Sequence, residues 1–369
     1  TLMHLDDRIA LAHRLMTDGW LPARLPEAPE ESAERTPSIE AARLRGMMLG
    51  LAIGDSLGNT TESMTSGARA AQFGEIRDYL PNRHAAGRAV GLPSDDTQMA
   101  AWTLESILAL GELDPEDLAA RFAAHRIFGI GQSVRQFLAR RASDPGPWYR
   151  HGAESAGNGA LMRIAPVLFL HARADAQGLD EDAALAALVT HHDTASVASC
   201  IAFLQLLRNA AVLDGPPPSR WWFEKFLASL RPVALETPYR PRGGVFDQLN
   251  MPFPDYVEHV IEHALDADWP TLHACNSWYS GAYLLETVPS ALYILMRHGH
   301  DAEEAIVRAV NDTKDNDTVA AIVGAAVGAL HGEESLPTRW REGLLGRTVA
   351  DDDGRLQALL EEAVKRFAA

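Results

Sequence analysis

The sequence predicts an all-α fold: one large orthogonal helical domain with a metal cleft over residues 41–369, and a helical N-terminal extension over residues 1–40. Three observations support this prediction. Apolar residues recur at helical spacing along most of the chain, alternating strand patterns are weak, and two apolar stretches carry glycine at every fourth position. No linker divides the part after residue 40, so we expect it to fold as one compact unit.

The N-terminal extension begins with a short amphipathic pattern. Leu5, Ile9, Ala12 and Leu15 follow helical spacing and form one apolar face. Residues 21–37, which follow, are rich in proline and glutamate, and this composition predicts an exposed linker.

Two predicted helices, over residues 39–57 and 319–331, carry rows of glycine. The rows consist of Gly46, Gly50, Gly54 and Gly58 in the first, and Gly324, Gly328 and Gly332 in or next to the second. Because each glycine inside a helix costs roughly 1 kcal/mol relative to alanine, such rows indicate helices that approach each other closely. This packing would bring Asp55, Asp315 and Asp317 into one neighbourhood.

The rest of the domain is predicted to be helical as well. We expect helices over residues 98–110, 115–127, 130–142, 161–173, 181–190, 194–212, 221–230, 255–266, 282–297, 302–310 and 354–368. Residues 231–255 are rich in proline and glycine and predict a long loop, and loops of that length are commonly functional or mobile.

Charge and cysteine content restrict the class of protein. The net charge of −17 argues against general binding to nucleic acids or anionic membranes, because no basic surplus neutralises phosphates. Cys200 and Cys275 are the two cysteines, and without a CxxC pair they indicate small buried side chains in a reducing, cytoplasmic compartment. We expect no membrane span, and residues 1–20 lack the apolar core of a signal peptide.

Two short acidic motifs lie roughly 220 residues apart. One is Ser94-Asp95-Asp96-Thr97, the other is the stretch from Asp312 to Thr318, and each directly precedes a predicted helix. Either motif alone is typical of a helix N-cap. If the two meet, their carboxylates require a compensating cation, and their oxygen ligands favour magnesium, calcium or manganese. The pair therefore predicts a hard-metal site built from distant segments.

Three further features offer polar groups, each with an ordinary structural alternative. Glu62 is either a solvated loop carboxylate or a metal ligand or general base. The turn Gly157-Asn158-Gly159 precedes an apolar stretch, so it is either a plain turn or an anion site at a helix N-terminus. His191 is either a ligand contact or a satisfied surface histidine, and no zinc-type spacing surrounds it.

Taken in order, these segments resemble the ADP-ribosylglycohydrolase family, whose best-known bacterial member reactivates dinitrogenase reductase. The resemblance spans roughly residues 42–345 and depends on six ordered segments. They are residues 46–58 with Glu62, residues 94–98, residues 157–166, Thr190 with His191, residues 281–283 and residues 315–324.

The resemblance implies an all-α hydrolase with two magnesium ions, or manganese in their place, in a cleft. It implies cleavage of the bond between the anomeric carbon of ADP-ribose and a modified protein side chain, with an arginine linkage favoured. The implied metal ligands are Ser94, Asp95, Asp96, Asp315, Asp317 and Thr318. The implied catalytic residues are Glu62, Asp95 and Asp315, and the implied substrate-binding residues are Gly157, Asn158, Gly159 and His191.

One position departs from the family pattern. The family usually has two glycines directly before the Asp-x-Asp-Thr motif, whereas this chain has Thr313 and Lys314. A glycine pair lets the backbone approach a phosphate more closely than Thr-Lys does. Lys314 would instead offer a positive charge to the substrate or pair with Asp312, and this leaves the substrate subclass open.

Two other classes of function compete with this interpretation. Some bacterial relatives act as immunity proteins, and residues 1–40 would then bind and block an ADP-ribosylating toxin. The ordinary alternative is a flexible terminus or one that packs on its own domain. The second competing class is a dimetal phosphoesterase, which would release phosphate instead of free ADP-ribose.

Overall fold

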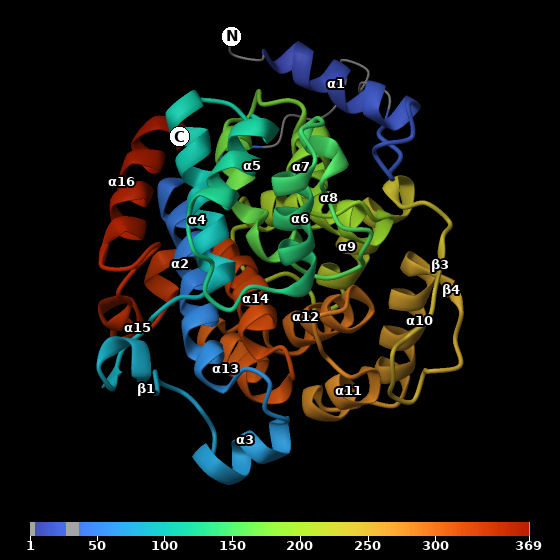
Figure 1. The fold of residues 1–369 in the computed structure, drawn as a ribbon. Helices are drawn as coiled ribbons and strands as arrows, with labels where there is room; N and C mark the ends of the chain where they lie inside the picture. Colours follow the sequence, from blue (N-terminus) through green and yellow to red (C-terminus); the bar gives the residue numbers. More distant parts are fainter. Residues whose placement is uncertain (1–3, 27–36, 369) are drawn as a thin grey trace.

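The computed structural model describes residues 4–26 and 37–368, and in these residues the protein is built from helices, which confirms the predicted all-α fold (Figure 1). The α-helices are α1 (Leu5–Thr17), α2 (Ala41–Gly58), α3 (Ser66–Phe73), α4 (Asp95–Leu110), α5 (Pro115–Ala124), α6 (Gln132–Ser143), α7 (Leu179–Leu188), α8 (Thr194–Ala210), α9 (Trp221–Val233), α10 (Phe253–Asp266), α11 (Thr271–Trp278), α12 (Leu284–His298), α13 (Ala302–Asp312), α14 (Asn316–His331), α15 (Thr338–Gly343) and α16 (Arg355–Phe367). None of these helices is both long enough and apolar enough to cross a membrane.

The strands are short and form two antiparallel pairs. β1 (Pro81–Asn82) pairs with β2 (Arg88–Ala89), and β3 (Pro238–Tyr239) pairs with β4 (Met251–Pro252). The second pair and its connection occupy most of the segment predicted as a long loop. That segment is shorter than expected, because α9 continues to Val233 and α10 begins at Phe253.

The glycine-bearing helices α2 and α14 pack against each other near the centre of the molecule, as predicted (Figure 1). A Cβ atom built on Gly50 would lie 2.0 Å from the carbonyl oxygen of Gly324, and one on Gly328 would lie 1.9 Å from that of Gly46. The two backbones are therefore in direct contact, which places the C-terminal end of α2 beside the N-terminal end of α14.

This contact makes Gly324→Ala a severe substitution. We expect it to lower the free energy of unfolding by about 3 kcal/mol, because the new methyl group overlaps the backbone of Gly50 and only a shift of a whole helix relieves the overlap. Chemical denaturation measures the change. Gly67→Ala in α3 is the matched control, since nothing lies within 4 Å of its added Cβ. Equal stability of the two variants would contradict the close packing.

The N-terminal helix α1 packs against α7, and residues 21–26, the described start of the predicted exposed linker, are partly buried. Arg8 is buried and donates to Asp182 Oδ1 at 2.8 Å. Leu21, Ala23 and Leu25 are also buried, because their apolar side chains cover the core. Residues 27–36 of the predicted linker lie outside the described residues, and a domain division at residue 40 stays a prediction.

Residues 161–173 form two 3₁₀ helices, η4 (Leu161–Arg163) and η5 (Ala165–His171), where an α-helix was predicted. Pro166 lacks a backbone N–H and its ring obstructs the preceding α-helical turn, which explains the tighter and interrupted form. The structure also contains three helices that the sequence pattern did not indicate, α3, α11 and α15, each of eight residues or fewer.

Both cysteines are buried, as predicted. Burial raises the pKa of the Cys200 thiol to about 12 and raises that of Cys275 as well. Neither thiol is therefore an activated nucleophile.

Candidate active site

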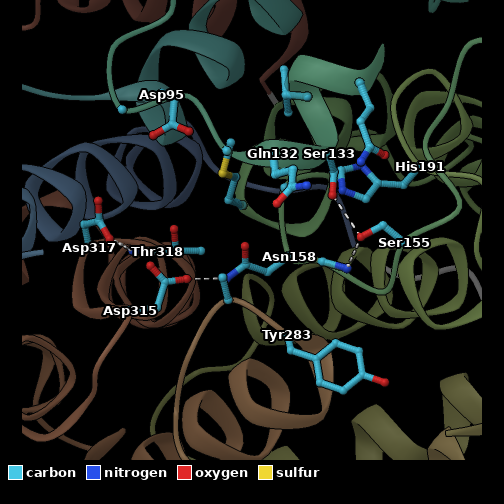
Figure 2. A pocket seen from close by; sticks show the side chains of 18 of the residues that line it. Asp95, Gln132, Ser133, Ser155, Asn158, His191, Tyr283, Asp315, Asp317 and Thr318 are labelled. Atoms are coloured by element: carbon cyan, nitrogen blue, oxygen red, sulfur yellow. Dashed lines mark hydrogen bonds between the residues drawn. The ribbon is translucent and has the colours of Figure 1, made fainter. Parts of the chain in front are cut away.

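The two acidic motifs meet at one pocket of about 400 Å³, although they are far apart in sequence (Figure 2). The start of α4 brings Asp96, the start of α14 brings Asp317, and the end of α2 brings Asp55. One oxygen from each of these three carboxylates lies within 4.8 Å of the others. Glu62 and Asp315 form a second such group with Asp317, so Asp317 belongs to both.

Asp55 holds the start of α4 in place. Its carboxylate accepts hydrogen bonds from the backbone N–H of Ser94 at 2.9 Å and of Thr97 at 3.1 Å, and from the hydroxyls of both residues at 2.6 Å. Asp55 therefore supplies the capping acceptor that the sequence assigned to the motif itself. The glycine rows predict Asp55 in this neighbourhood, but no local sequence pattern indicates that it caps α4.

The buried carboxylates carry an electrostatic cost that a cation would remove. Burial, together with the charges of Asp55, Asp95 and Asp315, raises the pKa of Asp96 well above its usual range. Burial, Asp96 and Asp315 raise the pKa of Asp317 in the same way. Neither carboxylate oxygen of Asp96 makes a hydrogen bond of normal geometry within the described residues. Carboxylate oxygens that are available as ligands, together with concentrated negative charge, suit a hard divalent ion.

The predicted metal ligands do not all occupy equivalent positions. Asp96, Asp315 and Asp317 belong to the two carboxylate groups. Asp95 and Thr318 line the pocket, but Asp95 lies outside both groups as the described residues define them. The hydroxyl of Ser94 already donates to Asp55. All six residues lie at or beside the pocket, and their roles as ligands stay predictions.

Glu62 follows the 3₁₀ helix η1 (Asn59–Thr61) and faces the open part of the pocket. The protein around it withdraws part of its solvation, and the nearby Asp315 and Asp55 add negative charge. These effects, of which desolvation is the largest, raise its pKa to about 7. A carboxyl with this pKa exchanges protons readily near neutral pH, as a general base must.

The turn at residues 157–159 connects the acidic end of the pocket to the opposite end. The side chain of Asn158 donates to Asp315 Oδ2 at 2.6 Å and to Thr287 Oγ1 at 3.0 Å, so it fixes the orientation of Asp315 (Figure 2). A 3₁₀ helix of three residues follows this turn where an α-helix was predicted, and anion binding at the turn stays a prediction.

His191 lies beside this turn and is fully buried. Its Nδ1 lies 2.8 Å from the hydroxyl oxygen of Thr190, while its Nε2 is buried and has no hydrogen-bond partner within the described residues. The residue as a whole lines the pocket. Burial and the nearby charge of Arg163 lower its pKa to about 3, so the ring is neutral at physiological pH. His191 is therefore not a surface histidine, and its environment suits contact with a ligand.

The structure adds residues for which the sequence gave no signal. Ser133 and Ser155 are hydrogen-bonded to each other at 2.8 Å on the pocket wall. Arg242, from the connection between β3 and β4, forms an ion pair of 2.9 Å with the buried Glu286 and lies over the ring of Tyr283. A sequence pattern does not show these contacts, because each depends on segments that meet only in the folded chain.

Lys314 faces a second pocket of about 410 Å³, which adjoins the first at Glu62 and Asp315. Its ammonium group lies 3.9 Å from the centre of the Tyr279 ring and contacts the hydroxyl of that tyrosine. The proposed pairing with Asp312 is wrong, because Asp312 is buried and instead accepts from Thr271 at 2.5 Å.

The described residues form a predominantly helical fold that gathers at one pocket carboxylates able to hold a metal ion. The chain belongs to the ADP-ribosylglycohydrolase family, whose model matches residues 36–368. It is accordingly an enzyme that hydrolyses a glycosidic bond of ADP-ribose.

Individual relatives agree with this family. The chain is 25% identical to the ADP-ribosylhydrolase ARH3 of Gallus gallus, over 82% of this chain and 88% of that protein. It is 25% identical to the ADP-ribosyl-[dinitrogen reductase] glycohydrolase of Rhodospirillum rubrum, over 82% and 90%. A solved structure titled "ADP-ribosylglycohydrolase-related protein complex" matches with a TM-score of 0.63 and 28% identity, over 89% of this chain and 99% of that one.

The raised pKa of Glu62 predicts how the stability of the metal-free protein depends on pH. A carboxyl whose pKa rises from 4.5 to about 7 on folding binds its proton more tightly in the folded state. Its contribution to stability is therefore present at low pH and is lost as pH rises from about 4.5 to 7. We expect thermal unfolding in chelator to show this loss when the wild type is compared with Glu62→Gln.

Magnesium should reverse this dependence, since a bound cation favours the ionised carboxylates. We expect its stabilising effect to grow with pH over the same range. An identical pH dependence of the wild type and Glu62→Gln in chelator would contradict the shift.

Proposed function

We propose that this chain is a magnesium-dependent hydrolase that removes ADP-ribose from modified protein side chains and uses two metal ions. The observation that carries the proposal is the pair of carboxylate groups that share Asp317 at one end of the pocket. The opposite end is lined by the Gly157–Gly159 turn and by His191, whose buried Nε2 has no hydrogen-bond partner within the described residues. This difference between the two ends of the pocket fits a ligand with ribose hydroxyls at one end and phosphates towards the other.

The residues that would hold the ions are Asp55, Asp96, Asp315 and Asp317, with Ser94, Asp95 and Thr318 beside them. Bound magnesium would supply positive charge that orients the ribose hydroxyls and polarises the reacting centre.

The protein's own groups would complete the reaction. Glu62 would take a proton from the attacking water, because bound cations would lower its pKa below about 7 and keep the carboxylate ionised at neutral pH. Asp315, held by Asn158, would face the positive charge that builds on the sugar ring in the transition state.

The arginine linkage stays a prediction from the family resemblance. The second pocket, which Lys314 faces, supplies an argument against this linkage. Lys314 places a cation there that would repel a guanidinium leaving group, whereas Glu286 offsets the charge of Arg242. Lys314→Ala is therefore expected to lower KM for an arginine-linked substrate about threefold, the size of one solvent-exposed charge interaction. KM for a serine-linked substrate should not change. An equal effect on both substrates, measured by steady-state kinetics, would contradict this role of Lys314.

A substrate panel tests the proposed function. Proteins or peptides carrying ADP-ribose on arginine or on serine are incubated with the enzyme in magnesium or in chelator, and the products are identified by mass spectrometry. We expect free ADP-ribose in magnesium alone. Equal release in chelator would exclude the metal mechanism, and no release from any conjugate would exclude the activity. Release of phosphate would favour the dimetal phosphoesterase.

A toxin-blocking role of residues 1–40 and a cytoplasmic location stay predictions. The packing of α1 on α7 supports a terminus that covers its own domain. Deletion of residues 1–36 separates these ideas, since loss of toxin binding with hydrolysis retained would favour the immunity role.

A further inference from the structure

We propose that Arg163 and Thr190 are positioning residues that fix the tautomer of His191, so that its Nε2–H donates to a phosphate oxygen of the ligand. This inference rests on the proposed function, because it assigns a phosphate-bearing ligand to the same pocket. Arg163 follows the Gly157–Gly159 turn and lies behind the pocket wall, so it is not expected to touch the ligand.

The three side chains form a buried chain of hydrogen bonds. Arg163 Nη2 donates to Thr190 Oγ1 at 2.7 Å and to the carbonyl oxygen of Ala186 at 3.0 Å. Thr190 Oγ1 in turn lies 2.8 Å from His191 Nδ1. Arg163, Thr190 and His191 are each fully buried, so water does not compete for these contacts.

The hydrogen-bond donors and acceptors around the Thr190 hydroxyl favour one tautomer of His191. A guanidinium only donates, so Thr190 Oγ1 accepts from Arg163 and has its single hydroxyl hydrogen left to give. Within the described residues, the other partner of this oxygen is His191 Nδ1. If the hydroxyl donates to Nδ1, the neutral ring carries its proton on Nε2. The opposite tautomer would leave the buried hydroxyl hydrogen without an acceptor, which is unfavourable.

His191 lines the pocket, and its Nε2 lies buried in the pocket wall. This atom has no protein partner and lies beside the turn, since a Cβ atom on Gly159 would lie 3.4 Å from it. Figure 2 shows His191 with Ser133 and Ser155 on one side of the pocket and Asp315 and Asp317 on the other. The ligand group at His191 must therefore accept a hydrogen bond.

The charge behind His191 indicates which acceptor this is. Within the described residues, Nε and Nη1 of Arg163 have no hydrogen-bond partner, and the guanidinium lies 4.6 Å from the centre of the Phe122 ring. A buried cation attracts negative charge to the neighbouring pocket. A phosphate oxygen both accepts the hydrogen bond and carries that charge.

Nuclear magnetic resonance of protein labelled with ¹⁵N-histidine tests the tautomer directly. The His191 signals are identified by their loss in His191→Gln, and long-range ¹H–¹⁵N correlations show which ring nitrogen bears the proton. We expect a neutral ring protonated at Nε2 in the wild type. A ring protonated at Nδ1 would overturn the proposal.

Calorimetric titration with ADP-ribose tests the consequence for binding. We expect Thr190→Val to raise Kd about tenfold, the effect of losing one hydrogen bond, and Thr190→Ser to restore binding. Thr103→Val is the matched control, because Thr103 is equally buried but donates within α4 to Met99. Equal Kd values for the two valine variants would overturn the proposal. If the wild type does not bind ADP-ribose, the proposed function fails. The nuclear magnetic resonance spectra still test the tautomer of His191 independently.

Discussion

Replacing Asp317 with asparagine is expected to lower kcat/KM about a thousandfold. Asp317 belongs to both carboxylate groups. One substitution would therefore weaken the binding of any metal ion between the two acidic motifs. Metal ions contribute several kcal/mol of transition-state stabilisation in comparable hydrolases, and about 4 kcal/mol corresponds to this factor.

The same substitution is expected to stabilise the metal-free protein. Burial and the neighbouring charges of Asp96 and Asp315 raise the pKa of Asp317, which means that its ionised form is unfavourable in the folded state. A neutral amide of the same shape removes that cost near pH 7, where the unfolded chain carries the ionised carboxylate. The hydrogen bond of 2.9 Å from the backbone N–H of Thr318 remains available to the amide oxygen.

Opposite effects on activity and stability distinguish a charged site from a structural cap. Steady-state kinetics and thermal unfolding in chelator give the two values. Asp214→Asn, an exposed aspartate, is the matched control and should change neither. Loss of stability in metal-free Asp317→Asn would show that the carboxylate serves the fold instead.

Glu62→Gln is expected to lower kcat about a thousandfold, within the range of general-base catalysis, with little effect on KM. The amide keeps the size of the side chain but takes no proton from water. In the wild type, kcat should fall as pH drops below the pKa of Glu62, because the base must be ionised. Bound cations lower this pKa, so the fall should occur between about 4.5 and 7.

Glu154→Gln supplies the control for Glu62, since Glu154 lines the same pocket but belongs to neither carboxylate group. It should keep both the rate and the pH profile of the wild type. Substantial activity in Glu62→Gln, with the acidic fall unchanged, would assign the base to another residue.

The sequence predicted correctly the features that depend on short stretches of the chain, such as glycine spacing and helix starts. The glycine rows of α2 and α14 have one physical explanation, close contact of two backbones, and that contact brings Asp55 and Asp317 together. The acidic motifs likewise lie at the starts of α4 and α14 and indicate where these helices begin.

The errors arise where tertiary contacts override local patterns. Residues after α1 look like a linker by composition, yet Leu21 and Leu25 are buried against the core. The apolar pattern at residues 161–173 is helical, but Pro166 prevents a continuous α-helix. Arg242 enters the pocket through its ion pair with Glu286, and a sequence alone does not show such a partner.

Anomalous diffraction from crystals grown with manganese tests the central claim most directly, because it locates ions without any assumption about activity. The account predicts two anomalous peaks, one among Asp55, Asp96 and Asp317 and one beside Asp315 and Asp317. Both peaks should disappear or weaken in Asp317→Asn crystals. Manganese bound elsewhere, with no peak between the two acidic motifs, would contradict the account.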